Sequence, residues 1–436
     1  MLYINVIIVL LSLFFLVNKK LILSFFVVLV TQIFIPQWDI WLHAFFSLSW
    51  ILLYSCAFQF NKISRCYLKP FVMYGFLLLF ISFFSDMPFL RSLLSVISMT
   101  LNYVGLGLIF LLSVKKYKEF CVISNCFVCL TLLSSLYAVF CLITYSNPYT
   151  DLLSTYFPKI SDYAEGFSDD IRGVTARITG VFSHPLVLGE FSLLAFCLIM
   201  VLIDEFKNKT LIILLLIITA FALLLSGTRS CILSLLVFLT IYFSSYFFNI
   251  KYWVGTLLVV LPLTLWSYSK LDTNTKSLIE ASIFFYDESK SSQISGSTVS
   301  LREKQMEYTL NQDAKVLTIG NGPGYITYSS KIKKRSSVMA GYESILFAKI
   351  AEEGLLGLTM FFIVVMVLFK CTIRGTTALF KKKVFAFYIS YIVCILMTNI
   401  QGTGHIFFLG CAMLLMYGRY IEKSSIGNIL QTEISN

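Results

Sequence analysis

The sequence predicts an all-α fold, a polytopic membrane helix bundle of about 12–13 transmembrane helices with two long extracytoplasmic loops. Three observations support this prediction. Of the 436 residues, 58% are hydrophobic and only 13% are charged, whereas soluble domains average roughly 25% charged residues. The apolar residues gather in segments of about 20, the length that crosses a bilayer as a helix. Lys and Arg recur in every second connection between these segments, as they do in cytoplasmic connections.

The predicted spans are bounded by charges and turn residues. They comprise residues 2–17, 21–36, 41–60, 70–85, 92–114, 119–146, 186–203, 210–226, 231–248, 252–269, 345–369, 384–400 and 404–420. The first segment has no basic leader region and no small-residue cleavage site after it, so we interpret it as an anchor. We therefore treat residues 1–436 as a single integral-membrane domain.

The placement of positive charge sets the predicted orientation. The net charge is +11, but the basic residues cluster in alternate connections such as 115–118 and 370–383. This topological placement indicates a lipid bilayer rather than a nucleic-acid partner. The basic side is expected to be cytoplasmic, with the N-terminus outside. Two long polar segments, 147–185 and 270–342, then lie outside as periplasmic loops, and a pair of long loops on one face indicates an active surface there.

Cysteine and histidine give no sign of a disulfide framework or a metal site. The eleven Cys lie in or beside apolar segments. Cys126 and Cys129 form a C-x-x-C inside an apolar helix, a setting that favours small core side chains over a redox pair. The three histidines, His43, His184 and His405, are far apart in the sequence, and no spacing fits zinc.

Arg172 and Arg177 precede the span that begins at His184-Pro185. Proline suits the first turn of a helix, and the free N–H groups of that turn favour an anionic ligand. The two arginines would add a bidentate grip on phosphate. Two alternatives stay open. Arg177 pairs with a nearby acid or snorkels to the interface, and His184 is a hydrogen-bonded structural residue rather than a base.

Arg229 follows Ser226-Gly-Thr in a tight connection between two predicted spans. The predicted topology places this connection on the same face as Arg177. Both guanidinium groups would then reach one phosphate-bearing ligand. The alternative is that Arg229 is a topological or headgroup anchor.

The second long loop contains a predicted amphipathic helix over residues 300–308, which carries Arg302. Its buried stripe would comprise Leu301, Gln305, Tyr308 and Gln312. The following Gly320-Asn-Gly-Pro-Gly324 segment predicts a flexible turn. No strand precedes these glycines and no suitable acid follows them, so we reject nucleotide binding.

The apolar segment that begins near Glu343 is too long to lie wholly in the hydrocarbon core. Residues 343–369 would form a helix of about 40 Å, against about 30 Å of hydrocarbon. Its first turns therefore stand at or above the interface. Lys349 and Glu353 are an i,i+4 pair and are expected to satisfy each other. Glu343 lies on a different face from Glu352, and it is either a structural ion-pair member or a catalytic acid/base.

These segments, in this order and on this predicted face, resemble the O-antigen polymerase and O-antigen ligase superfamily of bacterial surface polysaccharide assembly. The matching motifs are Arg177-x-x-Gly180-x-Phe182-x-His184-Pro185 with Gly189, Ser226-x-x-Arg229, Arg302, Gly320-x-Gly322-x-Gly324, and Glu343 with Glu353-Gly-Leu-Leu-Gly-Leu358. The resemblance covers about residues 175–360. The first six spans match only as hydrophobic helices.

The resemblance implies a glycosyltransferase of the bacterial inner membrane that acts at its periplasmic face without a metal or cofactor. Its substrate would be an undecaprenyl-diphosphate-linked oligosaccharide. Arg177 and Arg229 would hold the diphosphate, with Arg302 and Arg172 as further candidates. Glu343 or His184 would be the catalytic acid/base, because the acceptor hydroxyl must lose a proton.

A polysaccharide polymerase is the expected function. Ligases of this superfamily carry a His-Asn pair at the entry to the late span, where this chain has Tyr342-Glu343-Ser344. The alternatives are an O-antigen ligase, which attaches finished glycan to an acceptor lipid, and a lipid-linked oligosaccharide flippase or transporter. The apolar midplanes of the predicted spans and the lack of a visible repeat disfavour a transporter. A chain-length regulator and a flippase are the candidate protein partners.

Overall fold

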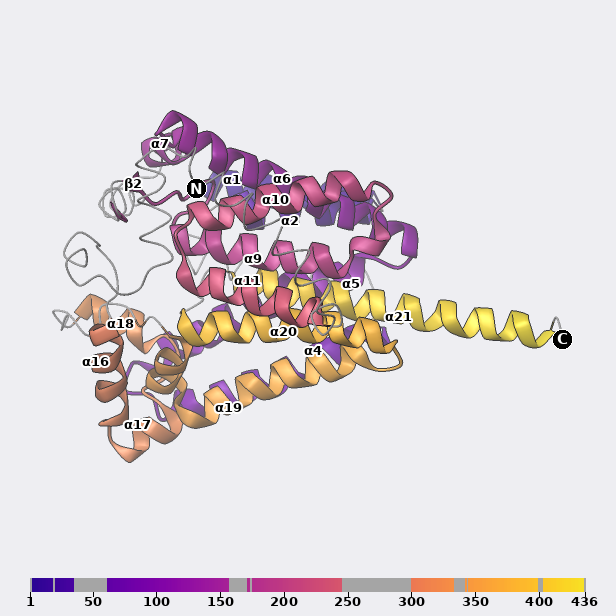
Figure 1. The fold of residues 1–436 in the computed structure, drawn as a ribbon. Helices are drawn as coiled ribbons and strands as arrows, with labels where there is room; N and C mark the ends of the chain where they lie inside the picture. The colour runs from indigo at the N-terminus through magenta and orange to yellow at the C-terminus, as the bar shows by residue number, and fades with distance from the viewer. Residues whose placement is uncertain are drawn as a thin grey trace. The chain divides into compact units, whose positions relative to one another are not determined.

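The computed structural model describes residues 2–18, 20–34, 61–156, 171–172, 175–244, 299–332, 342, 344–398 and 403–434. This part of the chain is almost entirely helical, which confirms the all-α prediction (Figure 1). Its one strand pairing is a short antiparallel ladder between β1 (Ile171–Arg172) and β2 (Thr175–Ala176).

Five of the described helices are long and apolar enough to cross a membrane. They are α4 (Lys62–Phe83), α5 (Phe89–Ser113), α6 (Tyr117–Thr144), α19 (Ile345–Ile373) and the Gly404–Ile421 part of α21 (Gly404–Ile434). Shorter apolar helices are α2 (Leu21–Phe34), α9 (Pro185–Val201), α10 (Lys209–Leu225) and α11 (Arg229–Tyr242). The remaining predicted spans that are described correspond to α1 (Leu2–Val17) and α20 (Ala378–Met397).

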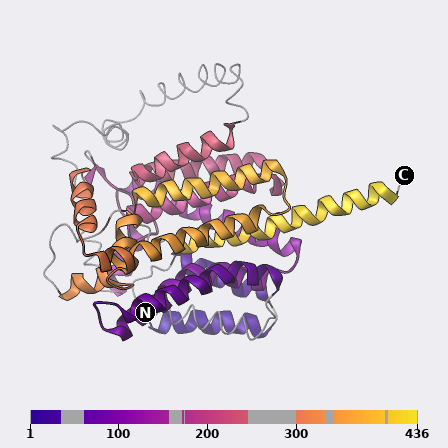
Figure 2. The same cartoon turned by 90° about the horizontal axis from the view of Figure 1, so that it is seen from below.

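Two helices extend well past the spans predicted from apolar residues. α4 begins at Lys62 rather than residue 70, because the Asn61 side chain caps it and accepts a hydrogen bond from the Ser64 N–H at 2.7 Å. α21 continues to Ile434 rather than ending near residue 420, and it extends beyond the other helices of its unit (Figures 1 and 2). Apolar composition marks the part of a helix that suits lipid, whereas caps and hydrogen bonding decide where the helix ends. The predicted spans 41–60 and 252–269 lie outside the described residues.

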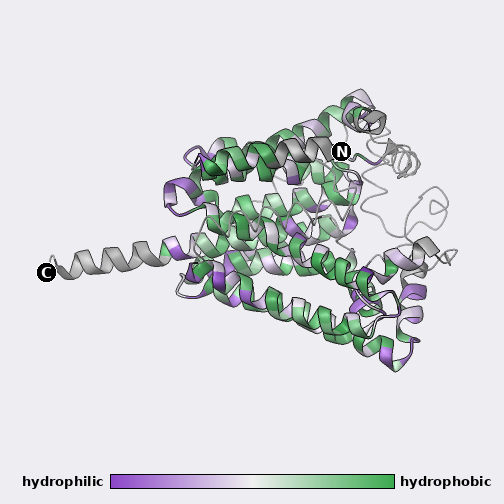
Figure 3. Ribbon diagram, turned by 180° about the vertical axis from the view of Figure 1, so that it is seen from behind, coloured by the Kyte–Doolittle hydropathy of each residue, from purple (hydrophilic) through white to green (hydrophobic). Residues whose placement is uncertain are grey.

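Large apolar side chains remain on the outer surface of the helices. Phe76 on α4 is 68% exposed, Ile143 on α6 is 71% exposed and Ile217 on α10 is 61% exposed. Figure 3 shows hydrophobic residues along most of the helix lengths, with hydrophilic residues mainly at the helix ends. Such apolar surfaces need a non-aqueous neighbour. Together with the helix lengths, they indicate a membrane protein.

The chain divides into two compact units. Unit 1 comprises Met1–Cys126, Ser297–Val384 and Ile395–Asn436, and unit 2 comprises Phe127–Gly296 and Phe385–Cys394. In unit 1, α4, α5 and α21 pack together through buried aromatic rings. The Phe71 ring meets the Phe408 ring edge-on at 4.9 Å between centroids, an arrangement that adds about 0.5–1.5 kcal/mol to the burial of the rings.

Unit 2 is built around α9, nearly every residue of which is buried. A helix that is apolar on all sides belongs in a protein core. α10 and α11 pack against it. The Ser390 hydroxyl of α20 donates to the Ser234 carbonyl of α11 at 3.0 Å, which ties a further helix into this unit. The N-terminal end of α9 is thereby fixed beside the α10–α11 connection.

The two predicted long loops contain helices of their own. Segment 147–185 includes α7 (Pro148–Tyr156), and segment 270–342 includes α16 (Val299–Leu310), α17 (Ala314–Ile319) and α18 (Tyr325–Ile332). The helix predicted over residues 300–308 is confirmed as α16. Of the predicted stripe, Gln305 is buried, whereas Tyr308 is 38% exposed. Among the described side chains of α16, those of Gln305 and Thr309 are buried, and their i,i+4 spacing places them on one face of the helix.

Candidate functional site

Arg177 reaches the connection between α10 and α11. Its Nε donates to the Ser226 carbonyl at 2.9 Å, and its Nη2 donates to the Thr228 hydroxyl at 3.1 Å. The side chain is only 7% exposed. Two stretches that are some 50 residues apart in the sequence therefore meet, and Arg229 directly follows the residue that Arg177 binds. We call Arg177 and the turn Ser226–Arg229 the arginine site.

The turn of the arginine site is closed by its own residues. Ser226 ends α10, and Gly227 takes a positive φ of 61°, which lets the chain reverse tightly. The Thr228 N–H donates to the Ser226 hydroxyl oxygen at 3.3 Å. Thr228 precedes α11, so Arg229 is the first residue of that helix and is half-buried. The turn thus presents a guanidinium group at a helix N-terminus.

The start of α9 packs against the same turn. A side chain added at Gly189 would lie 2.6 Å from the Ser226 hydroxyl oxygen and 2.9 Å from that of Thr228, so only glycine permits this approach. His184 caps α9, and its Nδ1 accepts the Leu186 N–H at 2.9 Å. The sequence analysis left open whether His184 is a structural residue or a base. The structure gives its Nδ1 a capping role, and a neutral His184 then carries its proton on Nε2, which can donate a hydrogen bond but cannot accept a proton.

Glu190 is a buried carboxylate that follows Gly189 on α9. It is 2% exposed and interacts electrostatically with Cys231 of α11. A buried carboxylate is costly unless positive charge or hydrogen bonds compensate it. The sequence analysis assigned Glu190 no role, although a carboxylate within an apolar span is itself a signal of function. We include it among the candidate residues at this end of unit 2.

The other predicted site residues are described less fully. Arg172 lies in β1 and Arg302 in α16, where the structure describes the backbone but not their side chains. Glu343 lies outside the described residues, next to Tyr342, whose hydroxyl has a raised pKa because it is buried. Arg302 and Glu343 belong to unit 1, whereas Arg172, Arg177, Arg229 and His184 belong to unit 2.

Unit 1 contains a buried charged cluster, which we call the lysine cluster. The predicted pair of Lys349 and Glu353 is confirmed, with 2.6 Å between Nζ and Oε1. Tyr74 of α4 closes the cluster. Its hydroxyl accepts from Lys349 Nζ at 2.6 Å and donates to Glu353 Oε2 at 2.6 Å. The ammonium group also lies over the rings of Tyr74, Tyr103 and Phe361 at 5.3, 5.8 and 5.0 Å.

The glycines of the second long loop form a tightly packed turn beside this cluster. Gly320, Gly322 and Gly324 have φ values of 73°, 109° and 86°. The Gly322 N–H donates to the Glu352 carbonyl at 2.8 Å. Both N–H groups of Asn321, backbone and side-chain, donate to the Ala351 carbonyl, at 3.0 and 3.1 Å. The predicted turn is confirmed, and close packing rather than flexibility explains its glycines.

Helix α19 is interrupted where it meets this turn. Gly354 has φ 66° and ψ −174°, which is not helical. A side chain there would lie 2.3 Å from the Thr318 carbonyl carbon and oxygen, and one at Gly320 would lie 2.3 Å from the Glu352 carbonyl oxygen. The two backbones therefore touch directly. Each needs a glycine at the contact point.

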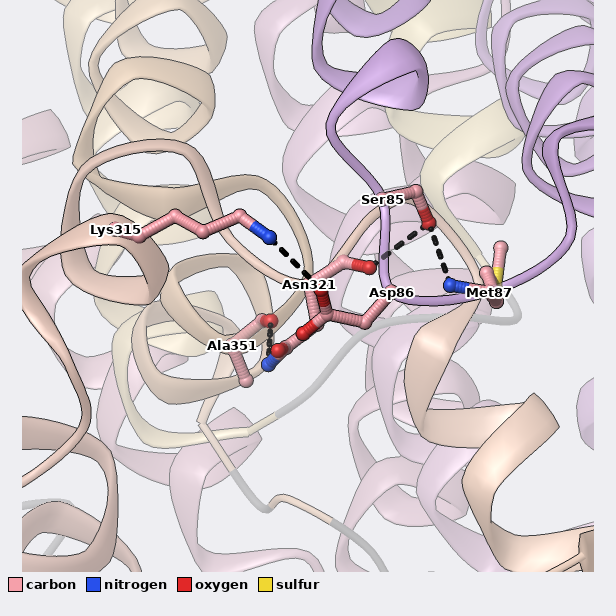
Figure 4. Close-up of polar contacts among 6 residues, drawn as sticks. All are labelled: Ser85, Asp86, Met87, Lys315, Asn321 and Ala351. Carbon is pink, nitrogen blue, oxygen red and sulfur yellow. Dashed lines mark hydrogen bonds and ion pairs between the residues drawn. The ribbon is translucent and has the colours of Figure 1, made fainter.

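The α4–α5 loop holds the opposite side of the turn (Figure 4). The Asn321 carbonyl accepts from the Ser85 hydroxyl at 2.9 Å and from the Asp86 N–H at 3.0 Å. Lys315 and Asp86 form an ion pair at 2.8 Å with both side chains about half exposed. We call Gly320–Gly324, with its contacts to the α4–α5 loop and to Ala351–Gly354, the glycine joint.

The described residues contain no group of three His, Cys, Asp or Glu side chains placed to hold a metal ion. A comparison with protein-family models finds no match to the chain, and a search of curated proteins finds no sequence that matches it.

Proposed function

We propose that the protein is a polysaccharide polymerase, a metal-independent glycosyltransferase of the bacterial inner membrane with a periplasmic active face. It transfers a growing glycan from undecaprenyl diphosphate onto an incoming lipid-linked repeat unit. The observation that carries the proposal is the contact between Arg177 and the turn that bears Arg229. This contact ties Arg177 to the residue that precedes Arg229, which supports a site in which two arginines from separate stretches share one diphosphate.

Within this proposal the two arginines have different tasks. Arg229 is half-buried at the start of α11, so it binds the diphosphate, supported by the N–H groups of that helix end. Arg177 is buried and uses two of its donors on the turn. It therefore positions Thr228 and Arg229, and adds positive charge nearby.

The transfer step follows from this placement. The bond between the anomeric carbon of the growing glycan and the diphosphate oxygen breaks, and a new bond forms from that carbon to a hydroxyl oxygen of the incoming unit. The diphosphate leaves on its lipid, and guanidinium groups stabilise its developing charge. The hydroxyl proton passes to a base, for which the carboxylate of Glu343 is the candidate, while His184 could take it only on Nδ1 after releasing the Leu186 N–H.

The test is the length of the polysaccharide in a deletion strain that carries variants of this gene. We expect Arg229→Ala to abolish the ladder of polymer lengths and leave single repeat units on lipid, because loss of a charged hydrogen bond weakens binding about 10- to 100-fold. Arg229→Lys keeps the charge but loses the planar fork, so short ladders are expected. Arg65→Ala removes an exposed arginine at the start of α4 and serves as the matched control. A full ladder from Arg229→Ala at normal expression would disprove the assignment.

A flippase or transporter is the second candidate function, and one observation favours it. α19 is interrupted at Gly354 beside the buried pair of Lys349 and Glu353, and transporters use interrupted helices with buried charges. In a deletion strain, lipid-linked units would then accumulate on the cytoplasmic leaflet. Loss of a polymerase leaves them on the outer leaflet, where a glycosidase added to spheroplasts can digest them.

An O-antigen ligase is the nearer alternative. Its loss leaves polymer of normal length that stays on undecaprenyl diphosphate and is not attached to its acceptor lipid. Extraction of the lipid-linked polymer followed by gel analysis separates this outcome from a polymerase defect, in which the polymer itself is missing.

A further inference from the structure

We propose that Glu352 and Asn321 are positioning residues, which hold α16–α18 and with it Arg302 in a fixed place at the interrupted end of α19. This inference rests on the proposed function, in which Arg302 is a candidate residue for binding phosphate. The glycine joint then holds α16–α18 in one fixed position and does not act as a hinge for a lid.

Glu352 is the first attachment point. Its Oε1 accepts the Ile326 N–H at 3.1 Å, in the first turn of α18 (Tyr325–Ile332). A carboxylate at this position compensates both the unpaired N–H groups and the positive end of the helix dipole. The neighbouring Glu353 has a different task, because its charge is balanced within the lysine cluster. The two adjacent carboxylates therefore stabilise different parts of unit 1: Glu352 binds the start of α18, and Glu353 belongs to the lysine cluster.

Asn321 is the second attachment point, and it binds in two directions. Its backbone and side-chain N–H groups both donate to the Ala351 carbonyl of α19. Its own carbonyl accepts from Ser85 and Asp86 of the α4–α5 loop. Asn321 is 8% exposed. One residue therefore joins α19, the α4–α5 loop and the α17–α18 turn, and its backbone makes three of the four bonds.

The packing of the joint argues against a moving lid. Glycines at positions 320, 322 and 354 each lie so close to a neighbouring segment that a methyl group would come within 2.3 Å of it. Closely packed contacts of this kind have few alternative arrangements. A second contact joins α18 to α5, where the Arg91 guanidinium lies 5.1 Å from the centre of the Tyr328 ring.

The experiment measures docking of α16 and polymer length in the same cells. Thr309→Cys places a thiol on α16 at a position that is fully buried, and Glu303→Cys places one on its exposed side. Both are labelled in intact cells with a membrane-impermeant maleimide, and labelling of the parent protein is subtracted. We expect Cys at position 309 to react at least about tenfold more slowly than Cys at 303 while the joint is intact.

Variants of Glu352 then test the attachment. Glu352→Ala removes the acceptor, and we expect labelling at position 309 to rise about tenfold and the polymer ladder to shorten. Glu352→Gln keeps an acceptor oxygen for the Ile326 N–H, so it should restore most of the protection and most of the ladder. Asn321→Ala removes only the side-chain bond to Ala351 and leaves the three backbone bonds of residue 321, so labelling at position 309 should rise less than in Glu352→Ala. Glu307→Ala, which removes an exposed carboxylate of α16, is the matched control and should change neither readout.

The outcomes separate this inference from the proposed function. Unchanged protection of position 309 in Glu352→Ala overturns the attachment, whatever the protein's activity. Lost protection with a full ladder overturns the positioning role. A deletion strain with normal polysaccharide overturns the proposed function, and with it the role for Arg302, while the labelling still decides whether Glu352 holds the segment. Labelling at position 303 only in permeabilised cells would place the segment inside and contradict both.

Discussion

The arginine site of unit 2 and the lysine cluster of unit 1 both place cations among apolar helices, but they treat the charge differently. Lys349 has a carboxylate, a phenol and three aromatic rings around it, and Glu353 is fully buried. Arg229 stands half-buried at a helix start, beside a turn that Arg177 holds. The Lys349 charge is enclosed by its partners, whereas Arg229 lies at the less buried start of a helix.

This difference shows that burial of a charge is a poor guide to function taken alone. The Lys349–Glu353 pair is deeply buried, and Tyr74 bonds to both of its charged groups, as a stabilising element requires. The candidate binding site is the less buried one. The two regions should therefore respond to mutation in opposite ways, with stability changing in one and activity in the other.

The largest effect is expected from Glu353→Ala. It leaves the Lys349 ammonium buried without its carboxylate, and removal of one partner of a buried pair costs about 3–5 kcal/mol. The free energy of unfolding, measured in detergent with denaturant, should fall by that amount. The double variant Lys349→Met with Glu353→Gln removes both charges and should recover part of the loss. Equal stability of wild type and Glu353→Ala would show that the pair is not structural.

A smaller loss is expected from Gly354→Ala. A methyl group at this position clashes with the Thr318 carbonyl and needs a φ of 66°, so the cost should be about 1–3 kcal/mol. Gly75→Ala in α4 is the matched control, because its nearest neighbours would be 3.8 Å away. That variant should be neutral or slightly stabilising, since alanine favours a helix by up to about 1 kcal/mol over glycine. Thermal unfolding of the two proteins side by side checks the contrast.

The smallest effect on stability is expected from Arg229→Ala, the variant with the largest expected effect on the polymer. A positive charge at the first position of α11 meets the positive end of the helix dipole, so its removal should change the unfolding free energy by less than about 1 kcal/mol. The same melting measurement should place this variant close to wild type. If Arg229→Ala unfolded as readily as Glu353→Ala, the arginine site would be structural, and the proposed difference between the two sites would be disproved.

Most of the fold was predictable from composition, whereas the contacts between distant segments were not. The pairing of Lys349 with Glu353 follows from helical spacing, but Tyr74 lies 279 residues away and no local pattern indicates it. Gly354 lies within an apolar segment whose sequence predicts an uninterrupted membrane-spanning helix. Its positive φ becomes evident only from its contact with Thr318.

The candidate site shows the same limit. The sequence analysis expected Arg177 and the turn at Arg229 to serve one ligand, and the structure brings Arg177 onto that turn. The bond from Arg177 to the Ser226 carbonyl could not be predicted. An arginine that binds phosphate and one that binds a backbone carbonyl look the same in a sequence. The capping role of His184 had a signal in the following proline, which favours the first position of a helix.

The break in α19 also bears on how deep in a membrane each part of this helix would lie. The straight helix that follows Gly354 runs from residue 355 to 373, about 28 Å at 1.5 Å per residue, which closely matches a hydrocarbon thickness of about 30 Å. If this part of α19 crosses the hydrocarbon core, the preceding turns, Ile345–Glu353, lie at headgroup level. There the ammonium and carboxylate of Lys349 and Glu353 are spared the full cost of the bilayer interior.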